Sequence, residues 1–169
     1  KISSKLFNIE KKESNRDLKQ VLCNGIIPLL LSVIWLYTSM ELFFYSFLAS
    51  ISAVNSDTWA TELGSLSKKQ PVNSINFKKI NKGESGGITL VGIIGGIFGS
   101  IITSVLSTNN GYLLILISIS GFLSCYFDSM LGSTLQAKYI CKNCQKSNEI
   151  GFHCNQNSEL IYGVKFFTN

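Results

Sequence analysis

The sequence has few charged residues, a single histidine (His153) and no basic run interleaved with aromatic residues. Asp, Glu, Lys and Arg make up 15% of its 169 residues, below the roughly 25% of a typical soluble domain. This scarcity of charge argues against an ordinary soluble domain. The missing basic–aromatic pattern argues against nucleic acid as a partner. What the chain has instead is hydrophobic residues, which make up 46% of it.

These hydrophobic residues fall into four stretches that are each long enough to span a bilayer core, which takes about 20 residues. The stretches are residues 20–38, 42–61, 88–107 and 112–133. We therefore predict an all-α fold, a polytopic membrane helix bundle of about four spans over residues 1–133. A small tail containing Cys and His, residues 134–169, follows the bundle.

The distribution of basic residues predicts the orientation of the spans. All 15 Lys and Arg residues lie in the N-terminal segment, the 62–87 loop or the tail. Four spans place these three segments on the same side of the membrane. The positive-inside rule assigns that side to the cytoplasm, or to the stroma or matrix of an organelle. We expect an integral membrane location, with a plastid or other organelle membrane among the candidates.

Three acidic residues lie near the predicted basic side of the bundle. Asp57 and Glu62 follow the apolar part of the second span, and Asp128 lies near the end of the fourth. An ionisable group near the hydrocarbon is costly unless it is paired, hydrated or metal-bound, so each is a functional candidate. Two carboxylates together with phosphate oxygens suit Mg²⁺. The alternative is that each acid caps a helix or pairs with a lysine.

A glycine-rich turn, NKGESGGIT (Asn81 to Thr89), leads directly into the third span. Such a turn before a helix presents backbone N–H groups to an anion. Its spacing does not match the G-x4-G-K-[ST] of P-loop proteins. The candidate phosphate-binding residues are Lys82, Gly83, Ser85, Gly86, Gly87 and Thr89 of the turn, together with Arg16, the only arginine. The alternatives are an ordinary flexible loop and, for Arg16, an interfacial side chain.

The tail contains three cysteines and the histidine at metal-ligand spacing. Cys141 and Cys144 are separated by two residues, and His153 and Cys154 follow. Three thiols and an imidazole suit a tetrahedral Zn²⁺ site, which is structural because four protein ligands leave no open position. A disulfide or a redox pair is the alternative, and a reducing compartment disfavours disulfides.

The third span is rich in glycine at helical spacing. Gly92 and Gly96, and likewise Gly95 and Gly99, form small-xxx-small pairs. Such pairs let a second helix approach closely in a membrane. We predict a helix–helix contact along this face.

Taken in order, the motifs RDLKQVLCNG, SDTWATELGSLS, KGESGGITLVG, DSMLGSTLQAKYICKNC and HCN resemble the integral membrane family that contains plant phytyl-phosphate kinase. The resemblance implies a lipid kinase that converts an isoprenoid monophosphate to the diphosphate with a nucleoside triphosphate. Asp57 and Asp128 would then hold Mg²⁺, Glu62 would support that ion or bind a second one, and the turn would bind phosphate. Family members carry further spans before Arg16 and after Asn169, so we expect terminal spans to be missing here.

Two other functions are alternatives to a kinase. One is a non-catalytic membrane subunit that keeps the kinase-like core within a larger membrane-protein complex. The other is a transporter or ion-binding protein, but it predicts acidic residues in mid-span, whereas here they lie near one face of the membrane. A kinase requires no general base other than the substrate itself, because a lipid phosphate is already ionised at neutral pH, and this agrees with the lack of any histidine except His153.

Overall fold

The computed structural model describes residues 18–144, 147–149 and 151–165, except for the side chains of 18–20, 147–148 and 153. Arg16 and the His153 side chain, both predicted ligands, lie outside the described residues. The chain forms two compact parts, Lys1–Ile51 and Ser52–Asn169. The predicted division at residues 133 and 134 is a different kind of boundary, between membrane helices and tail, and stays a prediction.

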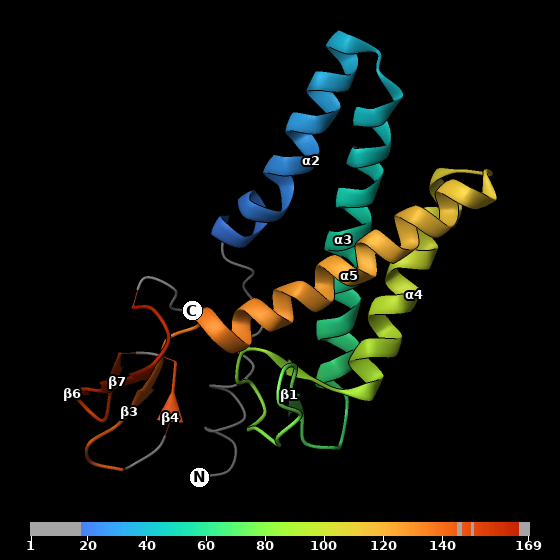
Figure 1. The fold of residues 1–169 in the computed structure, drawn as a ribbon. Coiled ribbons are helices and arrows are strands. Elements are labelled where there is room, and N and C mark those ends of the chain that lie inside the picture. Colours follow the sequence, from blue (N-terminus) through green and yellow to red (C-terminus); the bar gives the residue numbers. More distant parts are fainter. Residues whose placement is uncertain (1–17, 145–146, 150, 166–169) are drawn as a thin grey trace. The chain divides into compact units, whose positions relative to one another are not determined.

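The first part is a helical hairpin made of α2 (Leu18–Thr38) and the start of α3 (Glu41–Ser65), as Figure 1 shows. The N–H of Ser39, a residue with φ of 54°, donates to the Trp35 carbonyl at 2.7 Å and helps to form the turn. The Trp35 and Phe44 rings then pack with their centroids 4.8 Å apart. The apolar side chains along α2 are largely exposed, as expected for a helix surrounded by lipid.

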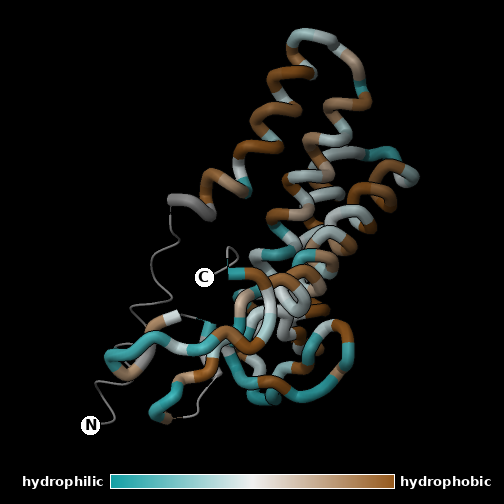
Figure 2. The backbone as a smooth tube through the Cα atoms, turned by 60° about the vertical axis from the view of Figure 1, so that its left-hand side comes forward, coloured by the Kyte–Doolittle hydropathy of each residue, from teal (hydrophilic) through white to brown (hydrophobic). Residues whose placement is uncertain are grey.

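Among the described residues, three helices are long and apolar enough to cross a membrane. They contain Val21–Thr38 of α2, Leu90–Ser107, which is all of α4, and Gly111–Leu135, which is all of α5. Figure 2 shows long hydrophobic segments along the helices, and much of the hydrophilic sequence in the loops and tail. The predicted helical membrane fold is confirmed. The stretch predicted as the second span, 42–61, is also helical but is too polar to meet the same criterion.

The glycine face of α4 packs against the second half of α3. A Cβ atom added at Gly95 would lie 2.7 Å from the carbonyl oxygen of Trp59. One added at Gly99 would lie 2.9 Å from the carbonyl oxygen of Asn55. Real Cβ atoms do not come this close to backbone, so only glycine allows the contact. The predicted close helix approach is confirmed, and its partner is α3.

The polar residues of α3 that lower its hydropathy form hydrogen bonds to the neighbouring helices. The Ser56 hydroxyl donates to the Gly96 carbonyl at 2.9 Å, and the Asn55 amide donates to the Gly99 carbonyl at 2.9 Å. The buried Ser52 hydroxyl lies 3.3 Å from carbonyl oxygens on both α4 and α5. These polar groups have hydrogen-bond partners on the neighbouring helices, so α3 tolerates them. Facing lipid, the same groups would have no hydrogen-bond partner.

Replacing Gly95 by alanine is expected to destabilise this helix pair, because the new methyl group must push against the α3 backbone. Overpacking of this kind costs about 1–3 kcal/mol. Gly25→Ala is the matched control, since Gly25 is also within a helix but a Cβ there would meet nothing within 4 Å. Thermal unfolding of the detergent-solubilised protein measures both variants. Equal unfolding midpoints for the two would contradict the close contact.

Short strands complete the second part of the chain. In the 62–87 loop, β1 (Val72–Asn73) pairs with β2 (Gly87–Ile88) in antiparallel register. In the tail, β3 (Lys138–Ile140) lies between β4 (Ser147–Asn148) and β7 (Glu159–Tyr162). The remaining pair is β5 (Phe152–His153) with β6 (Gln156–Asn157). The tail therefore has its own small sheets and is not an extension of α5.

Candidate functional site

The predicted acidic residue Asp57 lies where α3 meets α5. Its Oδ1 atom is 3.9 Å from the Cys125 sulfur, and the Cys125 thiol donates to it. Asp57 is half-buried, and Cys125 is buried. Cys125 is not among the predicted site residues, and its one signal in the sequence is its position three residues before Asp128.

Asp128 lies on α5 three residues after Cys125. Residues at this spacing share one helix face and are about 4.5 Å apart along the axis. Asp128 and Glu62 are both exposed on the surface of the protein. Within the described part of the chain, the three acids do not converge as one set of ligands. The structure thus places Asp57 beside the α5 segment that carries Asp128, with Glu62 further along α3.

The Asn81–Thr89 turn ends at the beginning of α4. Thr89 is the N-cap, and its hydroxyl oxygen accepts the N–H of Gly92 at 3.0 Å. Gly83 and Gly86 have φ values of 84° and 75°, in the left-handed region that glycine adopts without strain. The Lys82 ammonium donates to the Ser67 carbonyl oxygen. The turn is therefore a folded structure with its own hydrogen bonds and not an unstructured loop.

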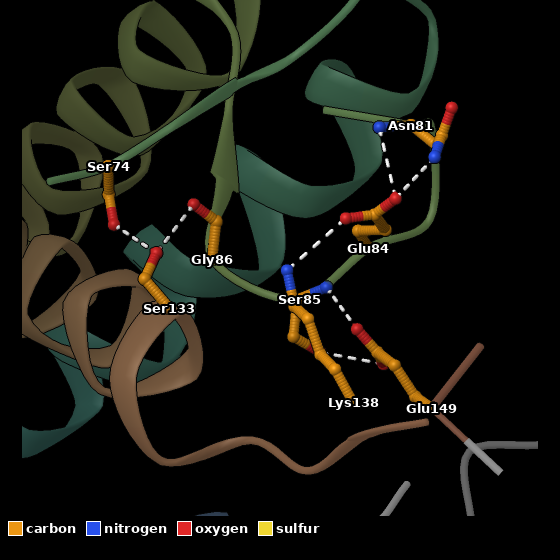
Figure 3. A network of polar contacts seen from close by, with 8 residues as sticks. All are labelled: Ser74, Asn81, Glu84, Ser85, Gly86, Ser133, Lys138 and Glu149. Atoms are coloured by element: carbon orange, nitrogen blue, oxygen red, sulfur yellow. Dashed lines mark hydrogen bonds and ion pairs between the residues drawn. The ribbon is translucent and has the colours of Figure 1, made fainter. Parts of the chain in front are cut away.

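One side of this turn packs tightly on the end of α5. The Ser133 hydroxyl donates to the Gly86 carbonyl at 3.1 Å, and the Ser74 and Ser133 hydroxyl oxygens are 2.8 Å apart (Figure 3). The Ser74 hydroxyl also lies 2.9 Å from the Ser129 carbonyl, and the Tyr126 hydroxyl donates to the Ser74 carbonyl at 2.9 Å. The loop around Ser74, which is buried, and the Gly86 end of the turn therefore both bind the end of α5.

The other side of the turn contacts the tail through two charged residues, also shown in Figure 3. Lys138 of β3 forms an ion pair with Glu84 at 3.2 Å. Glu149 accepts two hydrogen bonds from Ser85, from the backbone N–H at 2.6 Å and from the hydroxyl at 2.9 Å. Glu149 was not among the predicted site residues. It is the only acidic residue between Cys141 and Cys154, and that position was the one available signal.

The environment of Glu84 stabilises its charged form. Burial acts to raise the pKa of this carboxyl group. Hydrogen bonds from Asn81 and Lys138, together with the positive charge of Lys138, outweigh that effect, and the pKa lies below its usual value. Glu84 is therefore ionised at neutral pH, and the ion pair with Lys138 is intact there.

The predicted phosphate donors thus have partners within the protein. Ser85 donates to Glu149, Lys82 to Ser67, and Thr89 caps its own helix. The backbone of Gly86 is held against α5, and Gly87 is part of β2. The structure brings these residues of the turn together, and a phosphate would have to compete with the contacts that they already make.

The three cysteines of the tail form one cluster, called here the thiol cluster: Cys141, Cys144 and Cys154. Their sulfur atoms all lie within 4.8 Å of one another, close enough to bind one metal ion. The sulfur atoms of Cys144 and Cys154 are 3.8 Å apart. A disulfide needs about 2.05 Å, whereas two thiolates at about 2.3 Å from a tetrahedral zinc ion are about 3.8 Å apart. The spacing fits metal ligands better than a disulfide.

The thiols of this cluster interact with one another. A hydrogen bond with Cys144 is the main cause that raises the pKa of Cys154 to about 11. A metal ion binds thiolates, so its binding releases protons from the cluster. The described residues supply three ligands, and the fourth predicted ligand, His153, has its side chain outside the description.

Comparison with known families shows which family the chain belongs to. The family model described as "Integral membrane protein DUF92" matches residues 1–169. The chain belongs to the DUF92 family. The membrane family that its motifs resemble is thereby confirmed. No solved structure matches this DUF92 protein significantly.

Two relatives of this DUF92 protein come from distant organisms. An uncharacterized membrane protein of Methanocaldococcus jannaschii is 32% identical over 138 residues, which cover 78% of this chain and 56% of the relative. "Protein PGR" of Arabidopsis thaliana is 27% identical over 164 residues, which cover 79% of this chain and 57% of the relative. The chain thus spans a little more than half the length of each relative.

Proposed function

We propose that this protein is a membrane lipid kinase, which transfers a phosphoryl group from a nucleoside triphosphate to an isoprenoid monophosphate of the phytyl type. The observation that carries the proposal is the contact between Asp57 and Cys125. This contact brings the Asp57 carboxylate of α3 next to Cys125 of α5, and Asp128 lies one helical turn further along α5. Two carboxylates on adjoining helices are the protein ligands that a Mg²⁺–nucleotide complex takes.

The turn lies at the same end of the helices as these acids. A Cβ atom at Gly64, near the end of α3, would lie 3.3 Å from the Thr89 hydroxyl and 3.4 Å from the Gly92 Cα atom. Glu62 is two residues before Gly64. The end of α3, the start of α4 and the Asn81–Thr89 turn are therefore neighbours, which supports one site where a lipid phosphate and a nucleotide meet.

The proposed reaction needs little from the protein beyond position and charge. An oxygen of the lipid monophosphate forms a bond to the γ-phosphorus of the nucleotide, and the bond from that phosphorus to the β–γ bridging oxygen breaks. The nucleoside diphosphate leaves with the electron pair. The lipid phosphate is ionised at neutral pH, so no side chain has to remove a proton from it.

The side chains have separate roles in this proposal. Asp57 and Asp128 would hold Mg²⁺, which neutralises phosphate charge when bound. Glu62, exposed further along α3, would support that ion or a second one. Lys82 and the backbone N–H groups of the turn would bind phosphate oxygens, and Arg16, outside the described residues, stays a phosphate-binding candidate from the sequence alone. The lipid chain would lie along the apolar helices.

The test is a transfer assay with the purified full-length protein in detergent or nanodiscs. Labelled nucleoside triphosphate, Mg²⁺ and phytyl phosphate are supplied, and labelled phytyl diphosphate is the expected product. A panel of the four common nucleotides and of prenyl chain lengths defines the substrates. No transfer with any combination would overturn the proposal and favour a non-catalytic subunit of a membrane complex.

The same proposal includes an orientation. The turn and the tail would lie on the cytoplasmic or stromal side, where nucleotides are available, in a plastid or another organelle membrane. The basic residues of the 62–87 loop and of the tail support this orientation. Labelling of single cysteines placed at Lys79 and at Thr108, which follows α4, reports which side each faces.

For the tail we propose a structural Zn²⁺ site, made of the thiol cluster with His153 as the fourth ligand. The 3.8 Å spacing of the Cys144 and Cys154 sulfur atoms supports it. So does the small core of the tail, where the buried residues among those described are Ala137, Tyr139 and Cys141. A core of this size needs a metal or another covalent constraint to fold.

Metal analysis tests the zinc site. We expect about one zinc per chain in the purified protein, and a large loss of bound zinc in Cys144→Ser. Cys23→Ser is the control, since Cys23 is an exposed free cysteine of α2 and its loss should leave the zinc content unchanged. Less than about half an equivalent of zinc in the wild type would refute a four-ligand site.

A further inference from the structure

Glu149 connects the thiol cluster to the Asn81–Thr89 turn. It lies midway between Cys144 and Cys154 in the sequence, within the loop that a metal ion bound by both cysteines would close. Its carboxylate takes two hydrogen bonds from Ser85, at 2.6 Å and 2.9 Å (Figure 3). The segment between two metal ligands therefore carries the group that holds the turn.

The strand before the cluster makes the second contact with the turn. Lys138 begins β3, three residues before Cys141, and its ammonium lies 3.2 Å from Glu84. Glu84 and Ser85 are adjacent in the turn. A negative and a positive side chain of the tail thus bind neighbouring residues of the turn, and both belong to segments that run into the thiol cluster.

The position of these two segments depends on a very small structure. β3 pairs with β4, which has two residues, and Cys141 directly after β3 is 1% exposed. Glu149 directly follows β4. Among the side chains that the structure describes here, few apolar ones are buried, so the packing alone gives little stability. A metal ion that joins Cys141 and Cys144 to Cys154 would fix both segments at once.

We infer that metal binding by the thiol cluster controls the Ser85 side of the Asn81–Thr89 turn: the metal-bound tail holds Glu149 on Ser85, and loss of the metal frees the two donors of Ser85. The inference rests on the zinc site proposed above and is independent of the kinase activity. Because both donors of Ser85 are used by one carboxylate, Glu149 and a phosphate oxygen exclude each other there. The ordered tail is therefore a cap over part of the turn.

Hydrogen–deuterium exchange of the whole protein in nanodiscs tests the coupling. Samples are compared as purified with zinc, after removal of zinc by a chelator, and after zinc is added back. We expect amide exchange at Ser85, whose N–H donates to Glu149, to rise several-fold on zinc removal and to return on its addition. Exchange within α4 serves as an internal reference and should not change.

Two variants separate the contact between Glu149 and Ser85 from the metal site. Glu149→Gln should keep its zinc, since the residue is not a ligand, yet show fast exchange at Ser85 that no longer responds to the chelator. Glu159→Gln is the matched control, because Glu159 is also in the tail and pairs with Lys142 at 3.7 Å without touching the turn. Its exchange should equal that of the wild type.

The outcomes distinguish the two proposals. Protein that holds a full equivalent of zinc, but whose turn exchanges equally fast with and without it, keeps the zinc site and overturns the coupling. Protein that holds no zinc overturns both. Slow exchange at Ser85 in Glu149→Gln would also overturn the coupling, since the turn would then be held by something other than this carboxylate.

Discussion

The Asp57→Asn protein is expected to fold normally and to lose phosphoryl transfer by on the order of 100-fold or more, the effect of removing one preorganised charged group from a reaction centre. Asparagine keeps the shape of the side chain, and its amide oxygen can still accept the Cys125 thiol 3.9 Å away. It lacks the negative charge that a Mg²⁺–nucleotide complex needs. Initial rates with labelled nucleotide and phytyl phosphate, at saturating lipid, measure the loss.

Glu41→Gln is the control for Asp57→Asn. Glu41 is the first residue of α3, in the first helical turn and far along that helix from Asp57. The substitution Glu41→Gln removes one carboxylate from the same helix as Asp57→Asn does. A general effect of lost charge on expression or membrane insertion therefore appears in both variants. Unfolding midpoints should agree among the wild type and the two variants. If Asp57→Asn and Glu41→Gln transfer phosphate at the same rate, Asp57 has no part in the reaction.

The fold could be predicted from the sequence where the deciding interactions are local. Helical stretches follow from length and hydrophobicity, and α4 and α5 appear within two residues of their predicted bounds. The glycine spacing in α4 predicted a close helix neighbour because the physical reason, the missing Cβ atom, is contained in the residue type. It did not say which helix that neighbour is.

Hydrophobicity alone does not predict how α3 packs against the other helices. Its predicted span is helical, but residues such as Ser52 and Asn55 make it more polar than the other helices. Those side chains bind carbonyl oxygens of α4 and α5. A polar residue whose side chain will form a hydrogen bond with another helix looks the same in the sequence as an exposed polar residue. The two can be distinguished only when the pairing of helices is known.

The contacts around the turn could not be predicted for a related reason. Ser74 meets Ser133 across 59 residues, and Ser85 meets Glu149 across 64 residues. Nothing in the local pattern selects these partners among many serines and acids. The sequence did identify the turn itself, since its glycines and its position before a helix are local features. The backbone and hydroxyl donors of Ser85, which the sequence offered for an anion, are engaged by a carboxylate of the same chain.

Replacing Gly86 by alanine is expected to be the most damaging single change in the turn, because two independent effects add. At a φ of 75° a side chain adds strain of about 1–2 kcal/mol. The new Cβ atom would also lie 2.5 Å from the backbone nitrogen of Ser133 and closer still to its hydroxyl. Relieving that overlap costs about 1–3 kcal/mol more and separates the turn from α5.

Gly83→Ala isolates the first effect from the second. Gly83 has a similar φ of 84°, but a Cβ atom there would meet nothing within 4 Å. It should therefore lower the unfolding midpoint by the strain alone. A destabilisation of 1 kcal/mol lowers the midpoint of a chain of this size by about 2–4 °C, so the two variants are separable by thermal scanning in detergent. Equal midpoints for Gly83→Ala and Gly86→Ala would show that the turn does not pack on Ser133, and the anchor that holds it beside α5 would have to be sought elsewhere.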